Sequence, residues 1–246
     1  MDKLLYLSMT AATNTLLGEA AVASNLANAQ LPGFRADLEQ FRSMPVFGDG
    51  LPSRVYALSE RPGIDFSTGT IYKTDNPLDF AINGDGWIAV QDDNGNEAYT
   101  RRGDLRINNV GLLENGEGRL VYGNGGTIAI PPSETFEIAT DGTISIRPAG
   151  QDEKTLALVD RIKLVNPPVE DLYKGLDGLF RLRSGDPANI DASIRVSPES
   201  LETSNVSLVG AMARMIEHAR QFEMNIKAMT AAKENDEVGT RILSIS

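Results

Sequence analysis

The last fifth of the chain has the most regular pattern of hydrophobic and polar positions. Hydrophobic residues recur there at alternating steps of four and three, namely Leu208, Met212, Met215, Ala219, Phe222, Ile226 and Met229. Such steps average 3.5 residues, which keeps one seam of a helix facing a neighbouring helix. The pattern predicts a coiled-coil-type helix over 204–233, about 43 Å long at 1.5 Å per residue.

A second stripe with the same spacing lies near the start of the chain, interrupted only by Glu19. Its members are Leu5, Met9, Ala12, Leu16, Ala23 and Leu26. The chain would leave through one helix and return through the other, so antiparallel pairing is plausible. Two interpretations stay open: amphipathic helices packed on the protein's own core, or a helical stalk that packs mainly against other copies or sister proteins.

The middle of the chain has a different pattern. Residues 36–75 show no sustained period and are interrupted by proline and glycine, which indicates either an extended arm with short strands near 54–58 or a flexible surface loop. From 78 to about 196, short runs of β-branched and aromatic residues alternate with Asn-Gly and Asp-Gly turns, typical of antiparallel hairpins. The clearest runs are 87–91, 97–101, 119–122, 127–130, 135–138, 143–146 and 155–165.

These patterns together predict a mostly β fold with α-helical termini. A central antiparallel β domain, barrel-like or sandwich-like, would be inserted between N- and C-terminal coiled-coil-type helices. We expect a discontinuous helical stalk domain at 1–35 and 200–246, a linker arm at 36–76 and the β domain at 77–199.

Composition narrows the function classes. The chain has 246 residues, 34 acidic against 23 basic, a formal charge of −11 and no cysteine. An acidic chain without a basic cluster is a poor candidate for binding nucleic acid. Disulfides and thiolate chemistry are excluded. No apolar run approaches the length of a membrane span, and polar residues from Thr10 to Thr15 interrupt any signal-peptide core, so we expect neither membrane insertion nor a cleaved signal peptide.

No residue pattern predicts catalysis. His218 is the only histidine, and we interpret it as solvated or as part of an interface. Asp92, Asn94 and Asn96 are spaced as in a calcium loop, but Glu97 stands where that loop needs glycine, so a hairpin turn is favoured. We therefore predict no catalytic residue, no cofactor and no metal site.

Three separated blocks carry a resemblance to a known family. They are Ser24-Asn25-Leu26-Ala27-Asn28 with Pro32-Gly33-Phe34-Arg35, the central run from Pro77 to Trp87 with Ala98-Tyr99-Thr100-Arg101, and Ser200-Leu201-Glu202-Thr203-Ser204-Asn205-Val206. In this order they resemble the motifs of bacterial flagellar rod and hook proteins. The family motif residues at the two ends are Asn25, Leu26, Asn28, Pro32, Gly33, Phe34, Ser204, Asn205 and Val206.

The resemblance implies a structural subunit of the flagellar basal-body rod, of the proximal rod, with a distal-rod subunit as the nearest alternative. Its terminal helices would assemble helically with copies or with other rod proteins. Export would use the flagellar type III apparatus, which needs no cleaved signal. The rival from another class is a secreted β-rich enzyme or carbohydrate-binding module with a helical oligomerisation tail; truncating both ends should spare its activity but abolish the function of a rod subunit.

Overall fold

The computed structural model describes residues 3–45, 55–148 and 156–244. They form two compact units. The helical unit comprises 1–29, 36–65 and 206–246, and the β unit comprises 30–35 and 66–205. Each unit therefore takes in segments that are far apart in the sequence, and each is described in turn.

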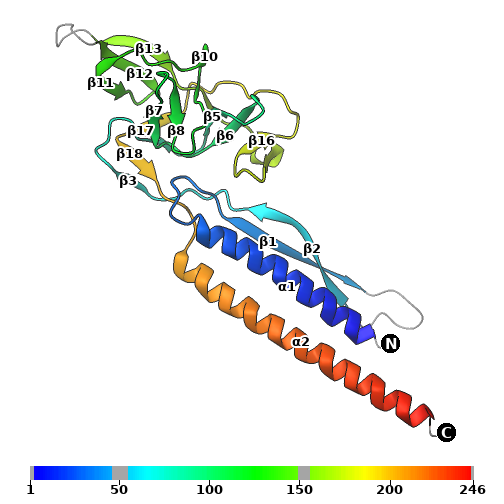
Figure 1. The fold of residues 1–246 in the computed structure, drawn as a ribbon. Helices are drawn as coiled ribbons and strands as arrows, with labels where there is room; N and C mark the ends of the chain where they lie inside the picture. Colours follow the sequence, from blue (N-terminus) through cyan, green and yellow to red (C-terminus); the bar gives the residue numbers. More distant parts are fainter. Residues whose placement is uncertain (1–2, 46–54, 149–155, 245–246) are drawn as a thin grey trace. The chain divides into compact units, whose positions relative to one another are not determined.

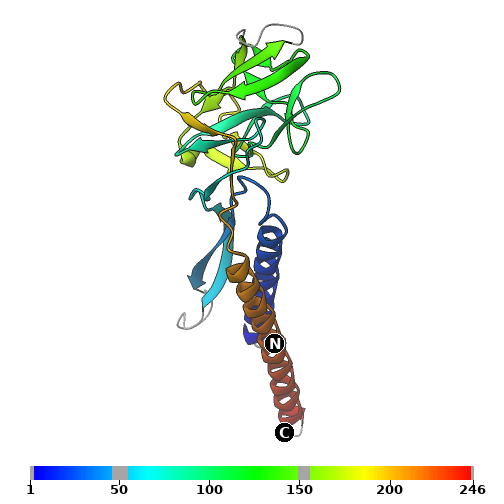
Figure 2. The same cartoon turned by 90° about the vertical axis from the view of Figure 1, so that its left-hand side faces the viewer.

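In the helical unit, two long helices lie side by side. Helix α1 (Lys3–Ala27) and helix α2 (Leu208–Ser244) run antiparallel, and α1 also contacts a hairpin of β1 (Asp37–Pro45) and β2 (Val55–Ile64) (Figures 1 and 2). Strands β1 and β2 pair from Asp37 opposite Ile64 to Pro45 opposite Val55. Within the segment 36–75, for which the sequence left an arm or a loop open, residues 37–45 and 55–64 thus form an antiparallel pair beside α1.

Local sequence explains where α1 ends. The Asn28 side chain donates a hydrogen bond to the Ser24 carbonyl at 2.9 Å, which satisfies an acceptor in the last turn. Pro32 and Gly33 follow, and neither residue favours continuation of a helix.

The β unit consists of short strands. Its elements are β3 (Ile71–Lys73), β4 (Phe80–Asn83), β5 (Trp87–Gln91), β6 (Glu97–Thr100), β7 (Leu105–Ile107), β8 (Leu113–Asn115), β9 (Tyr122–Gly123), β10 (Gly126–Thr127), β11 (Ser133–Ile138), β12 (Thr143–Pro148), β13 (Ala157–Arg161), β14 (Leu164–Val165), the 3-10 helix η1 (Val169–Asp171), β15 (Leu172–Lys174), β16 (Phe180–Leu182), β17 (Arg195–Pro198) and β18 (Ser200–Glu202). The predicted β character of this region is confirmed.

Its strands pair antiparallel in several small sheets. The largest has the order β14-β5-β6-β16-β15, a second has the order β11-β12-β13, and two-stranded sheets join β17 with β4, β18 with β3, β7 with β8 and β9 with β10. Among the described residues no sheet closes on itself, so the expectation of a barrel was wrong. The strands are short and pair in several small groups, so their hydrogen bonds form separate ladders rather than one closed sheet.

One predicted strand shows this division. The run 155–165 was expected to be a single strand, but its described part splits into β13, which pairs with β12, and β14, which pairs with β5. Between them, the Ile162 amide donates to the Gly142 carbonyl and the Lys163 amide to the Tyr122 carbonyl. The chain therefore passes from one sheet to the next within the predicted run, and residue 155 itself lies outside the described part.

A continuous hydrophobic core lies among these sheets. Buried aliphatic side chains from β4, β5, β8, β12, β14 and β17 pack together with Ile128, Ile162 and Leu179 from the connections. The alternation of buried and partly buried positions along β12 is the period of two that half-buried strands require. This core fixes the strands from which the residues of the next section project.

Candidate functional site

The three sequence blocks that carry the family resemblance meet at one buried carboxylate. The side chain of Glu202, at the end of β18, is fully buried between the guanidinium groups of Arg35 and Arg101. Its Oε1 lies 2.8 Å from an Nη of Arg35, and its Oε2 accepts a 2.8 Å hydrogen bond from Nε of Arg101. Arg101 and Glu202 are 101 residues apart in the sequence, so only the fold brings them together.

The second guanidinium also holds the central block in place. Arg101 donates 2.8 Å hydrogen bonds to the carbonyl oxygens of Gly84 and Gly86 in the turn between β4 and β5. Burial lowers the pKa of the Arg101 guanidinium, and the charge of Glu202 opposes that shift. Two guanidinium groups share the single carboxylate of Glu202, so this cluster carries an excess positive charge.

Backbone groups around Glu202 form further hydrogen bonds that join the segments meeting there. The Gly33 amide donates to the Glu202 carbonyl at 2.8 Å, and the Gly69 amide donates to Oε1 of Glu202 at 2.8 Å. The Asn205 amide reaches the Phe34 carbonyl at 3.3 Å, while its side chain donates to the Ser67 carbonyl at 3.1 Å. The segments 33–35, 67–70 and 202–205 are thereby fastened to one another, and we call them, with Arg101, the motif junction.

Gly33 gives a direct test of how tightly the junction is closed. Its φ is +66°, and a Cβ placed there would lie 2.5 Å from the carbonyl carbon of Arg101. Gly33→Ala is expected to destabilise the protein by more than about 2 kcal/mol, because left-handed strain and a backbone clash add together. Gly178→Ala is the matched control, since φ is +79° there and no atom lies within 4 Å; about 1 kcal/mol is expected. Urea unfolding measures both, and equal losses would contradict a closed junction.

The remaining family motif residues are divided between the two units. In the helical unit, buried Asn25 holds β1 by two bonds: its Nδ2 donates to the Asp37 carbonyl and its Oδ1 accepts from the Asp37 amide, both at 2.8 Å. Leu26 is partly buried on the same helix, while partly buried Pro32, Ser204 and Val206 lie in the connections beside Phe34 and Asn205. Lys174 Nζ lies 4.1 Å above the ring of Phe34, within range of a cation–π contact.

The predicted helix seams are only partly covered within the helical unit. On α1, Ala12 is buried and Leu5 and Leu26 are partly buried, whereas Met9, Leu16 and Ala23 are exposed. On α2, Met215, Phe222 and Met229 are partly buried, whereas Leu208, Met212, Ala219 and Ile226 are exposed. No member of the α2 seam is fully buried, so its role as a subunit interface stays a prediction.

Another row of α2 faces α1. It runs at seven-residue steps through Ala211, His218, Asn225 and Ala232, one residue before the exposed row of Met212, Ala219 and Ile226. His218 and Asn225 line a cavity of about 280 Å³ with Ala11, Asn14 and Thr15 of α1, and Asn225 donates a long 3.4 Å bond to the Thr15 hydroxyl. Small and polar side chains of α2 therefore contribute to the contact between the helices, together with the partly buried Met215, Phe222 and Met229, and His218 lies in this contact.

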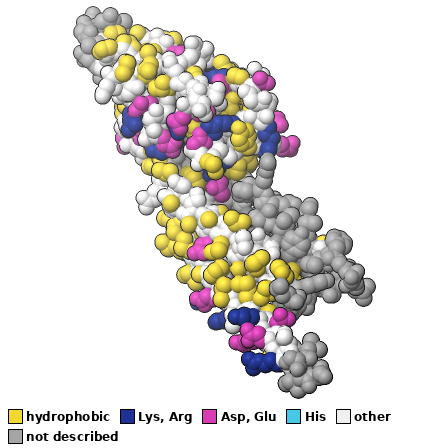
Figure 3. Space-filling model, turned by 45° about the vertical axis from the view of Figure 1, so that its right-hand side comes forward, with side chains coloured by type: hydrophobic (Ala, Val, Ile, Leu, Met, Phe, Trp, Pro, Cys, Tyr) yellow, Lys and Arg dark blue, Asp and Glu magenta, His cyan; other side chains and the backbone are white. Residues whose placement is uncertain are grey.

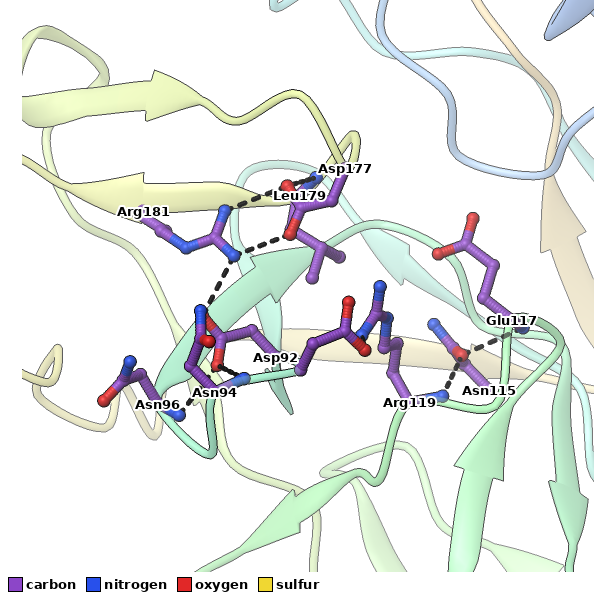
Figure 4. Close-up of polar contacts among 10 residues, drawn as sticks. Asp92, Asn94, Asn96, Asn115, Glu117, Arg119, Asp177, Leu179 and Arg181 are labelled. Carbon is purple, nitrogen blue, oxygen red and sulfur yellow. Dashed lines mark hydrogen bonds and ion pairs between the residues drawn. The ribbon is translucent and has the colours of Figure 1, made fainter.

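The calcium-like spacing after β5 forms a turn. Asp92 Oδ1 accepts hydrogen bonds from the backbone amides of Asn94 and Asn96 at 2.9 and 2.8 Å, and its Oδ2 lies 3.0 Å from Arg181 (Figure 4). Burial raises the pKa of Asp92, but the hydrogen bonds from Arg181 and the two amides lower it to below its ordinary value. Arg181 also lowers the pKa of Asp177. The predicted β5–β6 hairpin is confirmed, and the carboxylate of Asp92 stabilises its turn.

The sequence did not single out Arg35, Arg101 or Glu202 as site residues, although each lies inside a quoted motif block. Glu202 lies outside the predicted strands. The available signal was a charged residue at the end of a predicted strand, such as Arg101 in the run 97–101. Such a residue is usually exposed, and only the meeting of the three blocks shows that it is buried and paired.

The described residues show neither a membrane-spanning helix nor a cluster suited to a metal ion. Within those residues, neither helix combines the length and the apolar character that crossing a bilayer requires. The described side chains form no group of three or more histidines, aspartates or glutamates suited to a metal ion.

Comparison with known proteins agrees with the motif blocks. Residues 81–146 match the family model described as the flagellar hook protein FlgE/F/G D1 domain, and residues 197–242 match the flagellar basal body rod FlgEFG protein C-terminal model. The chain is 41% identical to the flagellar basal-body rod protein FlgF of Escherichia coli and 42% identical to that of Salmonella typhimurium, each over the full length of both chains. It is 29% identical to the rod protein FlgG of Bacillus subtilis, over 95% of this chain and 96% of that one. The chain therefore belongs to the family of flagellar basal-body rod proteins, and FlgF is the member type that it resembles.

Proposed function

We propose that this chain is a structural subunit of the proximal part of the rod and that it assembles through α1 and α2, which pack against helices of adjacent subunits. The observation that carries this proposal is the apolar surface that both helices expose. Figure 3 shows hydrophobic side chains gathered over the helical unit. The exposed apolar side chains of the two helices include Tyr6, Met9, Leu16 and Leu17 on α1, with Val209, Met212, Ile216 and Met224 on α2.

The amount of exposed apolar surface favours a partner. Single exposed apolar side chains are common on monomers, whereas a row along a helix marks an interaction surface. Burying a large aliphatic side chain contributes about 1.5–3 kcal/mol, and both helices offer several. Helix α2 is also longer than α1, with 37 residues against 25, and every side chain described from Lys233 to Arg241 is exposed. This end of α2 is available to a neighbouring molecule.

The other features support a role in assembly rather than catalysis. The buried carboxylate of Glu202 is occupied by two guanidinium groups, and those of Asp92 and Asp177 stabilise hairpins, so the described acidic clusters serve the fold. Export through the flagellar type III apparatus is part of the same proposal. Placement in the distal rod is the alternative, which the FlgG relative keeps open.

Purified basal bodies test the proposal directly. Immunoblots with antibodies against the chain should find it in detergent-purified hook–basal bodies of its own cells, at a fixed ratio to the other rod proteins. Cells that lack the chain should be non-motile. Recovery of the chain only from the soluble or secreted fraction, with normal rods in the deletion strain, would contradict the proposal and favour a secreted binding module.

A further inference from the structure

A cavity of about 320 Å³ lies in the β unit beside the motif junction. Its lining joins the rings of Trp87 and Phe66 and the pair Pro167-Pro168 with the guanidinium-bearing residues Arg35 and Arg101. This volume is at the lower end of the range for sites that bind small ligands. The cavity suits a group of a few heavy atoms with a polar end and an apolar body.

The apolar part of the lining is rigid. The ring of Trp87 packs on Phe180 with centroids 4.3 Å apart and meets Phe66 edge-on at 6.2 Å. Proline has a fixed φ, so the two prolines restrict the backbone that continues from β14. A preformed aromatic and proline surface binds an apolar side chain at a small entropic cost.

The polar part of the lining has an unused donor. Arg35 is 2% exposed, and its Nε has no hydrogen-bond acceptor among the residues that the structure describes. An unsatisfied buried donor costs about 1–3 kcal/mol, more when the group is charged. Asp85 also lines the cavity, but it is exposed to water. The charge of Asp85 acts on Arg101, so the two buried guanidinium groups are opposed by one buried and one exposed carboxylate.

We propose that this cavity binds a peptide segment with a side-chain carboxylate, supplied by a neighbouring rod subunit. The carboxylate would lie on Arg35, and an adjacent apolar side chain would lie on Trp87 and Phe66. The proposal rests on the proposed function, because a rod subunit is named as the source of the segment. Charge complementarity favours this occupant: subunits of such acidic composition present many carboxylates to one another, and the incompletely paired guanidinium of Arg35 attracts them.

Intrinsic fluorescence provides the measurement, because Trp87 is the only tryptophan of the chain. The probes are acetyl-Ala-Glu-Phe-Ala-amide and the same peptide with glutamine in place of glutamate. We expect a saturable change in Trp87 emission with the glutamate peptide, with a Kd of about 1 mM or below. The glutamine peptide should bind at least roughly tenfold more weakly, because it lacks the charge that the guanidinium recognises.

A matched pair of variants locates the binding. Val169→Glu places a competing carboxylate in the lining of the cavity, whereas Val110→Glu makes the same change in the loop between β7 and β8. Both valines are exposed, by 50% and 84%, so both variants should fold. Val169→Glu is expected to weaken binding of the glutamate peptide at least roughly tenfold, and Val110→Glu should bind like the unaltered chain.

Three results would overturn the proposal: no emission change up to about 10 mM peptide, equal binding of the two peptides, or unchanged binding by Val169→Glu. If the chain is found in basal bodies but binds neither peptide, the cavity proposal falls and the rod function stands. If the chain binds the glutamate peptide but is absent from basal bodies, the rod function falls, and with it the rod subunit as the source of the segment.

Discussion

Replacing Glu202 with glutamine is expected to destabilise the β unit by about 3–5 kcal/mol, because two buried guanidinium groups lose their only shared counter-charge. For a unit of this size the loss corresponds to a fall in Tm of roughly 6–20 °C. Glutamine keeps the size of the side chain, so lost packing contributes little. Urea unfolding followed by the emission of Trp87, which lies in the same unit, measures the effect.

Glu199→Gln is the matched control. Glu199 lies just before β18 and is 3.5 Å from Lys73, but its side chain is 46% exposed. Exposed ion pairs contribute about 0.2–1 kcal/mol, so this substitution should change stability by less than about 1 kcal/mol. Equal effects at Glu199 and Glu202 would show that burial of the cluster is unimportant.

A double mutant separates charge from packing at the junction. Arg35→Met combined with Glu202→Gln removes one guanidinium together with the carboxylate, which leaves less uncompensated buried charge than Glu202→Gln alone. Neighbouring residues in one ion network show coupling energies of about 0.5–3 kcal/mol. The double mutant should therefore lose less free energy of unfolding than the two single mutants lose together. A loss equal to that sum would contradict the coupling.

Met212→Glu together with Ile226→Glu is expected to prevent stable incorporation into the rod while the β unit keeps its stability. Both side chains are exposed, by 53% and 41%, so the change is tolerated in the separate chain. If they are buried between subunits, each glutamate places an unpaired charge in an apolar contact, at a combined cost of about 2–6 kcal/mol. Association would weaken by at least roughly thirtyfold. Swimming assays and recovery of the chain in basal bodies give the readout.

Ala213→Glu together with Ala231→Glu is the control for added charge. Both alanines are exposed on α2, outside the predicted seam, and glutamate is nearly as good a helix former as alanine. These cells should swim normally, and circular dichroism should give the same helix content for both double mutants. If the Met212 and Ile226 variant is motile with normal rods, the exposed row of α2 is not the subunit interface.

Local patterns were sufficient to predict the terminal helices and the β character of the middle of the chain. Helices at both ends follow from 3.5-residue hydrophobic spacing, and the hairpin of β5 and β6 follows from alternation around Asn94-Gly95. Both features depend on interactions between residues near in sequence, where periodicity and turn chemistry act directly. The division of 155–165 between two sheets was not predictable, because the local pattern of a strand does not show where its partner strand changes.

The contact between α1 and α2 shows that hydrophobic periodicity predicts a helix but not which of its rows faces the partner helix. Rows one residue apart on a helix differ by about 100° of rotation, and a broad apolar face satisfies more than one of them. The sequence favoured the larger side chains of Met212 and Ile226, whereas the fold turns Ala211, His218 and Asn225 inward. Small side chains let two helices approach closely. Which row of a helix faces its partner therefore depends on the shape of the partner helix, and the hydrophobic pattern of one helix carries no information about that shape.

By itself, the sequence determined an acidic chain with helical ends, a β-rich middle and three motif blocks, since each of these is a property of composition or of neighbouring residues. Only the tertiary structure decided that Arg35, Arg101 and Glu202 form one buried cluster. The free energy of a buried charge depends on its distance to a partner and on the exclusion of water. Both are set by segments more than a hundred residues apart, so no local pattern records them.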